Sequence, residues 1–358
     1  MKKLVIVTAV ALALGTHAEL GNADVATRYM VTDLGTLKGD NTSLALAINN
    51  SGQAVGYSYN INYATNNTTA EHAALFSTTG GANTDLGTLG GIYSTATAIN
   101  DRGQIVGSAS MPGDTTSHAT LFSITGTANV DLGTLGGTYS SANAINNKGQ
   151  MVGYSFTSDN TAWHATLFNT TGGANVDLGT LGAPGSVATA INDKGQVVGW
   201  ADTPDSVSHA TLFSITGGAA INLGGIYSNA NAINDRGQVV GQASMPGNIY
   251  GEATLFSTTG GASIPMGASG AAVAINNNGQ VVGDTVRSPF LWENGVATYL
   301  SSLIDQRSGW ILLYAAGIND RGQIVGEGYN RGIGQYHAVL LTPIQAPIKG
   351  ILNNPFGR

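Results

Sequence analysis

Cysteine is absent from this chain of 358 residues, and charged residues make up only 10% of it. Without cysteine there are no disulfides, so packing and hydrogen bonds must hold the fold together. Basic residues are also scarce, because 14 Lys and Arg stand against 21 Asp and Glu, a formal net charge of −7. This balance argues against nucleic acid as a partner, since phosphate binding needs clustered Lys and Arg.

Hydrophobic runs long enough to cross a membrane are also lacking, because a spanning helix needs about 20 apolar residues. The run LVIVTAVALALG follows MKK at the N-terminus and precedes the small-residue stretch THA. Charged, apolar and cleavable zones in this order are typical of a secretory signal peptide. We expect residues 1–18 to be removed after Ala18, which leaves a secreted or periplasmic protein that is not inserted in a membrane.

The sequence motifs of several common enzyme classes are missing. The chain has no Gly-x-Ser-x-Gly elbow, no Walker loop, no paired His-Glu zinc motif and no dinucleotide-binding fingerprint. We therefore expect no cofactor and no metal, and no motif identifies a catalytic residue.

One unit is repeated seven times along the chain. Each copy contains an A-I-N phrase, or G-I-N in the last copy, followed by x-x-G-Q, and successive phrases lie 42 to 51 residues apart. This period is found in propeller blades and in helical repeats. The abundance of Gly, Thr, Val and Asn and the short alternating runs favour strands. The asparagines of the phrase are Asn49, Asn100, Asn146, Asn192, Asn234, Asn276 and Asn319.

The second copy illustrates the four strands that we expect in each unit. They are STATAIN (94–100), QIVGSAS (104–110), HATLFS (118–123) and ANVDLG (128–133). The residues N-D-R-G at 100–103 connect the first two as a tight turn, in which the Asn side chain bonds the backbone ahead and Gly takes a positive φ. A calcium loop is disfavoured here, because one carboxylate per turn supplies too few ligands.

The two ends of the repeat region complement each other. YMVTDLG (29–35) is a lone fourth strand, and the last copy ends with a third strand, HAVLLT (337–342). Their pairing would cover the exposed edges of the first and last sheets. We predict an all-β fold, a seven-bladed β-propeller of four-stranded blades over residues 29–343, closed by pairing of the N-terminal strand with the C-terminal blade and followed by a tail (344–358).

The repeated motifs resemble the HAF repeats of exported bacterial proteins. Those units carry D-L-G-T-L-G-G, A-I-N-x-x-G-Q-x-V-G and H-A-F-L-W. Here DLGTLGG stands at 85–91 and 131–137, and HATLF at 118–122, 164–168 and 209–213. The D-L-G-T-L-G-G segment shrinks in the later copies. The resemblance implies export and a repeat fold, and it supplies no catalytic residue.

Histidine recurs at the start of the third strands, a pattern that raises the question of a metal site. Equivalent positions there lie roughly 10 Å outside the innermost strand and diverge, so their imidazoles cannot share one zinc ion. We interpret these residues as structural, bonding neighbouring backbone or the Asp of a D-L-G segment, and these Asp residues as turn caps. The histidines are His72, His118, His164, His209 and His337.

Function is expected where the copies differ, on the face formed by the loops between second and third strands and by the links between units. The position after the V-G pair and the adjoining loops mix aromatic, acidic and amide side chains, which suits sugar-like or peptide-like ligands. Alternatively, the aromatic residues pack between blades and the charges are only solvated. The candidate ligand-binding residues are Tyr57, Tyr154, Trp163, Trp200, Asp202, Asp284, Arg287 and Glu327.

The resulting interpretation is an exported, monomeric, non-catalytic β-propeller that binds extracellular polysaccharide or a cell-surface protein. The alternative is a glycan hydrolase or lyase acting on the same face, with Asp284 and Glu327 as its catalytic candidates. These two acids replace neutral residues at one repeated position in adjacent units. Carboxyl groups about 5 to 10 Å apart can perform such chemistry.

Overall fold

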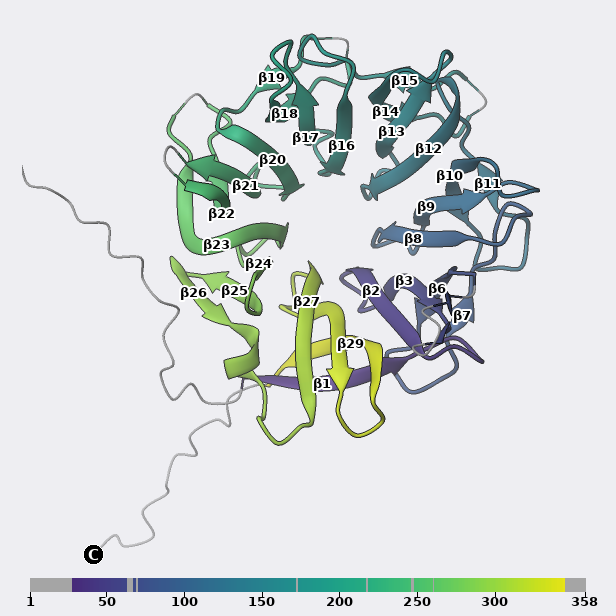
Figure 1. Ribbon diagram of the computed structural model, residues 1–358, viewed down its shortest axis with the longest axis vertical. Helices are drawn as coiled ribbons and strands as arrows, with labels where there is room; N and C mark the ends of the chain where they lie inside the picture. Colours follow the sequence, from purple (N-terminus) through teal and green to yellow (C-terminus); the bar gives the residue numbers. More distant parts are fainter. Residues whose placement is uncertain are drawn as a thin grey trace, which may run out of the picture.

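The computed structural model describes residues 28–62, 67–68, 70–171, 173–216, 218–245, 248–259 and 261–344. They form an all-β fold in which several sheets stand around a central axis, as in a β-propeller (Figure 1). The predicted signal peptide and all but the first residue of the predicted tail lie outside the described residues. Within those ranges, no helix is long and apolar enough to span a membrane.

Each of the first four units is an antiparallel sheet whose strands follow one another outward from the axis. These units contain β2 (Thr42–Ile48), β3 (Ala54–Tyr59), β6 (His72–Phe76) and β7 (Thr84–Asp85); β8 (Ser94–Ile99), β9 (Ile105–Ser110), β10 (Ser117–Phe122) and β11 (Val130–Asp131); β12 (Gly136–Ile145), β13 (Met151–Thr157), β14 (Trp163–Phe168) and β15 (Val176–Asp177); and β16 (Ser186–Ile191), β17 (Val197–Asp202), β18 (Ser208–Phe213) and β19 (Ile221–Asn222).

The later units follow the same order with longer outer segments. The strand β23 pairs with β22 in the fifth unit and then with β24 in the sixth. The small strands β4 (Ile61–Asn62) and β5 (Asn67–Thr68) pair in the loop after β3. The remaining elements are β20 (Ile226–Ile233), β21 (Val239–Met245), β22 (Asn248–Phe256), β23 (Ile264–Ile275), β24 (Val281–Thr285), β25 (Pro289–Glu293), β26 (Val296–Tyr299), the 3₁₀ helix η1 (Leu300–Leu303), β27 (Trp310–Ile318), β28 (Ile324–Asn330) and β29 (Gln335–Pro343).

The outermost strand of the second unit is shorter than the sequence suggests. Residues 128–133 are predicted as a strand, but β11 spans only Val130–Asp131. The chain turns immediately afterwards, because Gly133 has a φ of 69° and its N–H donates to the Asp131 carboxylate at 2.7 Å. The predicted fourth strand therefore ends in an Asp-capped turn.

The N-terminal strand joins the last strand, as the sequence predicts. Strand β1 (Tyr29–Gly35) pairs antiparallel with β29, with Tyr29 opposite Pro343 and Gly35 opposite Ala338 (Figure 1). His337 reinforces the pair, since its Nδ1 lies 2.8 Å from the Asp33 carboxylate. The two ends of the described chain thus share one sheet.

Hydrophobic cores lie between neighbouring units. One cluster combines Val106 of the second unit with Ala142, Ile145 and Phe168 of the third. The innermost strand contributes the small, fully buried Ala142, and the third strand contributes Phe168, which is 5% exposed. Burial of such a Phe contributes about 1.5–3 kcal/mol. Small side chains near the axis and large ones farther out are expected where neighbouring sheets diverge from an axis.

The glycine of the V-G pair is required by the close approach of the first two strands. A Cβ on Gly199 would lie 1.9 Å from the main-chain oxygen of Val187. The first strand is irregular at this point, with a register shift between Ala188 and Ala190. Sheet geometry therefore accounts for this repeated glycine.

Candidate functional site

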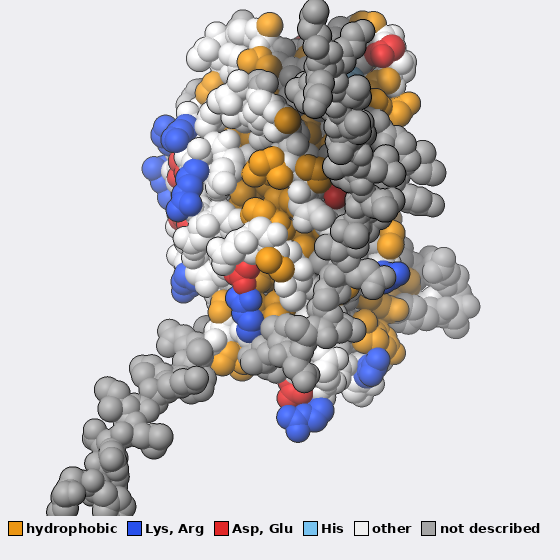
Figure 2. All heavy atoms as spheres, turned by 90° about the vertical axis from the view of Figure 1, so that its left-hand side faces the viewer, with side chains coloured by type: hydrophobic (Ala, Val, Ile, Leu, Met, Phe, Trp, Pro, Cys, Tyr) orange, Lys and Arg blue, Asp and Glu red, His pale blue; other side chains and the backbone are white. Residues whose placement is uncertain are grey.

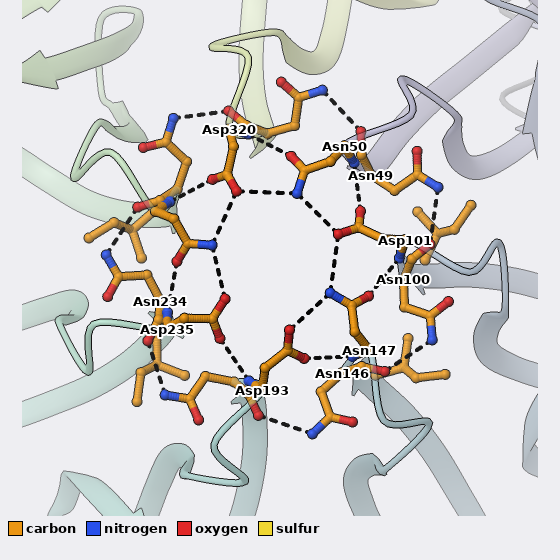
Figure 3. A pocket seen from close by; sticks show the side chains of 18 of the residues that line it. Asn49, Asn50, Asn100, Asp101, Asn146, Asn147, Asp193, Asn234, Asp235 and Asp320 are labelled. Atoms are coloured by element: carbon orange, nitrogen blue, oxygen red, sulfur yellow. Dashed lines mark hydrogen bonds between the residues drawn. The ribbon is translucent and has the colours of Figure 1, made fainter.

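The A-I-N turns gather around the central axis (Figure 3). In the second unit the side-chain oxygen of Asn100 accepts hydrogen bonds from the N–H groups of Arg102 and Gln104, at 3.1 and 2.9 Å. Gly103 has a φ of 76°. The turn chemistry predicted from the sequence is confirmed, and the same bonds recur in the other units.

The side-chain amides of the same asparagines link each turn to the next. Asn100 Nδ2 donates to the main-chain oxygen of Asn146 at 3.0 Å, and Asn319 Nδ2 donates to that of Asn49 at 3.0 Å. The other turns are joined in the same way, so the series of bonds returns to its start. These side chains are buried with their hydrogen-bonding groups satisfied, which stabilises the ring of turns.

A second cycle is formed by the residue that follows each of these asparagines. The N–H of Asp193 donates to the Asp235 carboxylate at 2.8 Å. An equivalent bond joins each of the remaining pairs of neighbouring turns. Their side chains surround a central pocket of about 180 Å³ (Figure 3). The residues of this second cycle are Asn50, Asp101, Asn147, Asp193, Asp235, Asn277 and Asp320.

Amides and carboxylates alternate around this second cycle except at one place. Asn147 Nδ2 donates to both Asp101 and Asp193, and Asn277 Nδ2 donates to Asp235 and to its other neighbour. Seven positions cannot alternate throughout, and Asp193 and Asp235 are therefore neighbours without an amide between them. Among the described residues, no group of three or more His, Asp or Glu side chains could hold a metal ion.

The repeated histidines bond to the outer turns, as interpreted from the sequence. His118 Nδ1 lies 2.9 Å from the Asp131 carboxylate. His209 Nδ1 lies instead 2.7 Å from the main-chain oxygen of Gly225. The other pairs with a D-L-G carboxylate are His72–Asp85, His164–Asp177 and His337–Asp33.

On the opposite face, two of the predicted ligand-binding residues lie close together where the first and last units meet. Burial raises the pKa of Tyr57, and Glu71, Tyr59, Glu327 and Tyr314 raise it further. The rings of Tyr57 and Tyr59 are stacked with centroids 6.1 Å apart. Tyr57 and Glu327 are therefore close enough to interact, although they are far apart in sequence.

Asp284 of the sixth unit contacts the last unit next to Tyr314. Its carboxylate accepts a hydrogen bond from the Ala315 N–H at 3.1 Å. Ala315 follows Tyr314, which stands opposite Glu327 in the β27–β28 pair. We call these side chains from the sixth, seventh and first units the junction cluster: Tyr57, Glu71, Asp284, Tyr314 and Glu327.

The carboxyl groups of the junction cluster ionise less readily than usual. Burial raises the pKa of Glu327 to about 7, and no hydrogen bond to this carboxyl is found among the described residues. Burial raises the pKa of Asp284 to about 6, although the Ala315 N–H favours its ionised form. Burial also raises the pKa of Glu71, against the effect of the Thr95 hydroxyl. Near neutral pH the cluster can therefore both donate and accept hydrogen bonds.

The other predicted residues are distributed around the same face. Trp163 packs against Phe156 with ring centroids 6.0 Å apart, and Phe156 packs against Tyr139 at 5.9 Å. Asp202 accepts a hydrogen bond from the Ser208 hydroxyl at 2.5 Å. No hydrogen bond, ion pair or ring contact between either group and the junction cluster is found in the described parts of the chain. Of the rest, Tyr154 and Trp200 are half-buried and Arg287 is exposed.

The sequence interpretation missed a row of exposed tyrosines on this face. Tyr93 immediately precedes β8, and Tyr139 and Tyr227 lie near the starts of β12 and β20. They are 48%, 43% and 63% exposed, respectively. Their signal was present in the sequence, because G-G-x-Y-S occurs at 90–94, 136–140 and, as GGIYS, at 224–228. Exposed aromatic rings at equivalent positions offer flat surfaces for stacking.

Comparison with known proteins supports the fold alone. Residues 19–181 match a family described as "Protein of unknown function (DUF3466)". No curated protein matches the sequence. The acylaminoacyl peptidase of Pyrococcus horikoshii has a TM-score of 0.52 at 11% identity, over 83% of this chain and 50% of the peptidase. TolB from Acinetobacter baumannii has a TM-score of 0.46 at 11% identity, over 86% of this chain and 65% of TolB.

These coverages mean that the chain spans half the length of the peptidase and less than two thirds of TolB. At such low identity, a shared fold carries no information about a shared activity.

Proposed function

We propose that this protein is an exported, non-catalytic binding module whose junction cluster recognises an extracellular polysaccharide. The observation that carries the proposal is the carboxyl of Glu327, which is half-buried beside Tyr57 and Tyr314 without a hydrogen-bond partner among the described residues. A sugar supplies the missing groups, because its hydroxyls both donate and accept hydrogen bonds. Its apolar ring face stacks on tyrosine.

The arrangement of the chain supports this placement. We infer that the seven units are seven blades of HAF type, because each contributes one A-I-N turn to the central cycles. The pairing of β1 with β29 then brings the first and last blades together at the junction cluster. Export, with residues 1–18 as signal peptide, places the site where polysaccharide is found.

Glycan-array binding by the intact mature chain tests the proposal. We expect binding to at least one polysaccharide, weakened at least tenfold by Glu327→Gln or Tyr314→Ala. The matched control is Glu252→Gln, the same substitution in β22 of the fifth unit, outside the junction cluster. Equal affinity of Glu327→Gln and the unmodified protein for every bound glycan would reject the junction cluster as the site.

A glycan hydrolase or lyase is the second candidate, favoured by the pKa values of the two acids. Glu327, with a pKa of about 7, retains a proton that a general acid could donate, and Asp284, with a pKa of about 6, is mostly ionised at neutral pH. Release of reducing ends from the bound glycan tests this activity. Turnover that disappears in both Asp284→Asn and Glu327→Gln would establish the enzyme, whereas binding without turnover supports the binding module.

A further inference from the structure

The face opposite the junction cluster carries a ring of cationic side chains. The third position of the A-I-N turn is basic in five units and neutral in two, where it is Ser51 and Asn278. All five basic side chains are exposed, and none of them forms an ion pair within the described ranges. They are Arg102, Lys148, Lys194, Arg236 and Arg321.

The turns hold the backbone of the five basic residues at equivalent positions around the axis. The N–H of each basic residue donates to the side chain of its own A-I-N asparagine, at 3.1 Å in all five turns. Two cycles of hydrogen bonds around the axis join these turns to one another. Four of the five, from Arg102 to Arg236, occupy consecutive units. A flat surface can therefore meet them all at once.

The acidic groups of the same turns are less available to a partner. Asp101, Asp193, Asp235 and Asp320 direct their carboxylates toward the axis, where they accept hydrogen bonds from neighbouring turns (Figure 3). Figure 2 shows Lys and Arg side chains gathered along one edge of the molecule, with acidic side chains between them. All five basic side chains are exposed, whereas three of the four carboxylates are half-buried and only that of Asp101 is exposed.

The remaining loops on this face carry no opposing charge in the first five units. They connect third to fourth strands and consist of Ser, Thr, Ile, Gly, Ala and Asn, as in STTGGAN (77–83) and SITGTAN (123–129). Acidic residues of the opposite face act little here, because charges are screened within about 8 Å at physiological ionic strength. The A-I-N turns of this face carry five basic and four acidic side chains, so the face is slightly positive although the chain has a net charge of −7.

We propose that this ring docks the protein on a membrane surface that carries anionic headgroups, with the junction cluster turned away from the membrane. A bilayer is favoured over a linear polyanion because the five cations stand at equivalent positions of a ring, which a single extended strand crosses without contacting all of them. Basic residues near an anionic leaflet each contribute about 1 kcal/mol, or roughly a fivefold increase in partition. Docking of this kind requires no insertion into the membrane.

Co-sedimentation of the full chain with vesicles tests the proposal. Vesicles of phosphatidylcholine and phosphatidylglycerol in equal parts are compared with phosphatidylcholine alone, at low and at physiological salt. The test variant combines Arg102→Gln, Lys148→Gln, Lys194→Gln and Arg236→Gln. The control variant loses the same charge from the opposite face through Lys38→Gln, Arg287→Gln, Arg307→Gln and Arg331→Gln.

We expect binding to the anionic vesicles only, weakened by salt, lost by about 100-fold or more in the ring variant and retained in the control. Circular dichroism of both variants confirms that they are folded. Equal loss in ring and control variants, or no preference for anionic vesicles, would overturn the proposal. Binding to immobilised heparin without binding to vesicles would also overturn it, and would assign the ring to a linear polyanion.

Discussion

The side-chain amide of Asn319 donates a hydrogen bond of 3.0 Å to the main-chain oxygen of Asn49, 270 residues away in the sequence. This bond joins the last A-I-N turn to the first and completes the cycle formed by the A-I-N asparagines. The same amide also reaches Gln323 Oε1 at 2.9 Å, and its carbonyl oxygen accepts the N–H groups of Arg321 and Gln323. One buried side chain thus holds its own turn and connects two ends of the fold.

Replacement of Asn319 by Ala should lower the free energy of unfolding by about 2–4 kcal/mol, because several buried backbone groups lose their partners at once. Urea unfolding followed by fluorescence measures the change. Asn278→Ala is the control, since Asn278 is exposed and its side chain makes one bond, to the Asp320 main-chain oxygen. Equal losses in the two variants would show that the cycle of A-I-N asparagines adds no stability.

The single acid–acid neighbour pair in the second cycle, Asp193 and Asp235, predicts a stabilising substitution. Asp193→Asn supplies an amide that can donate to the Asp235 carboxylate, and it removes one of two adjacent charges. It also removes one of the two acceptors of Asn147 Nδ2, which keeps its bond to Asp101. We expect the free energy of unfolding to rise by about 1 kcal/mol. The thermal midpoint, measured by circular dichroism, should rise accordingly.

Asp101→Asn is the matched comparison for that substitution. The Asp101 carboxylate accepts hydrogen bonds from the amides of Asn50 and Asn147, so a new amide there would face two donors. We expect this variant to be destabilised by about 1–2 kcal/mol. If both variants shift the midpoint in the same direction, the alternation of donors and acceptors is not what stabilises the cycle.

The glycine of the V-G pair should tolerate no side chain. Gly199→Ala would place a Cβ 1.9 Å from the Val187 oxygen, so the two innermost strands must separate. We expect a loss of at least about 3 kcal/mol or failure to fold. Gly332→Ala is the control, because the nearest atom to its Cβ is the side-chain oxygen of Asn330 at 3.2 Å. Soluble yield and thermal midpoint report the difference.

The local chemistry of this fold could be predicted from the sequence. The turn at 100–103, the His118–Asp131 pair and the pairing of residues 29–35 with the last strand follow from patterns within one unit or at the ends of the chain. Each depends on donors and acceptors that a short segment must pair. The residues that carry these groups can be identified from the sequence.

Relations between units could not be predicted in the same way. Counting ligands in one turn gives one carboxylate at Asp101, but the fold brings four such carboxylates to one pocket. The burial that raises the pKa of Glu327 likewise comes from packing between units, since Glu327 of the last unit lies beside Tyr57 of the first. The basic ring is hidden for the same reason, since its members are 42 to 46 residues apart in four consecutive units and the overall charge is negative.

The half-buried carboxyl of Glu327 predicts that the stability of the protein depends on pH. Its pKa rises from 4.5 in the unfolded chain to about 7 in the fold, so the folded state loses stability as the pH rises through this range. Glu327→Gln should therefore stabilise the protein by about 1–2 kcal/mol at pH 8 and by little at pH 4, after allowance for partial exposure. Thermal unfolding at both pH values, with Glu252→Gln as control, measures the effect. An equal gain in stability at pH 4 and pH 8 would show that burial does not raise the pKa of Glu327. The hydrogen-bonding role proposed for its carboxyl would then fail.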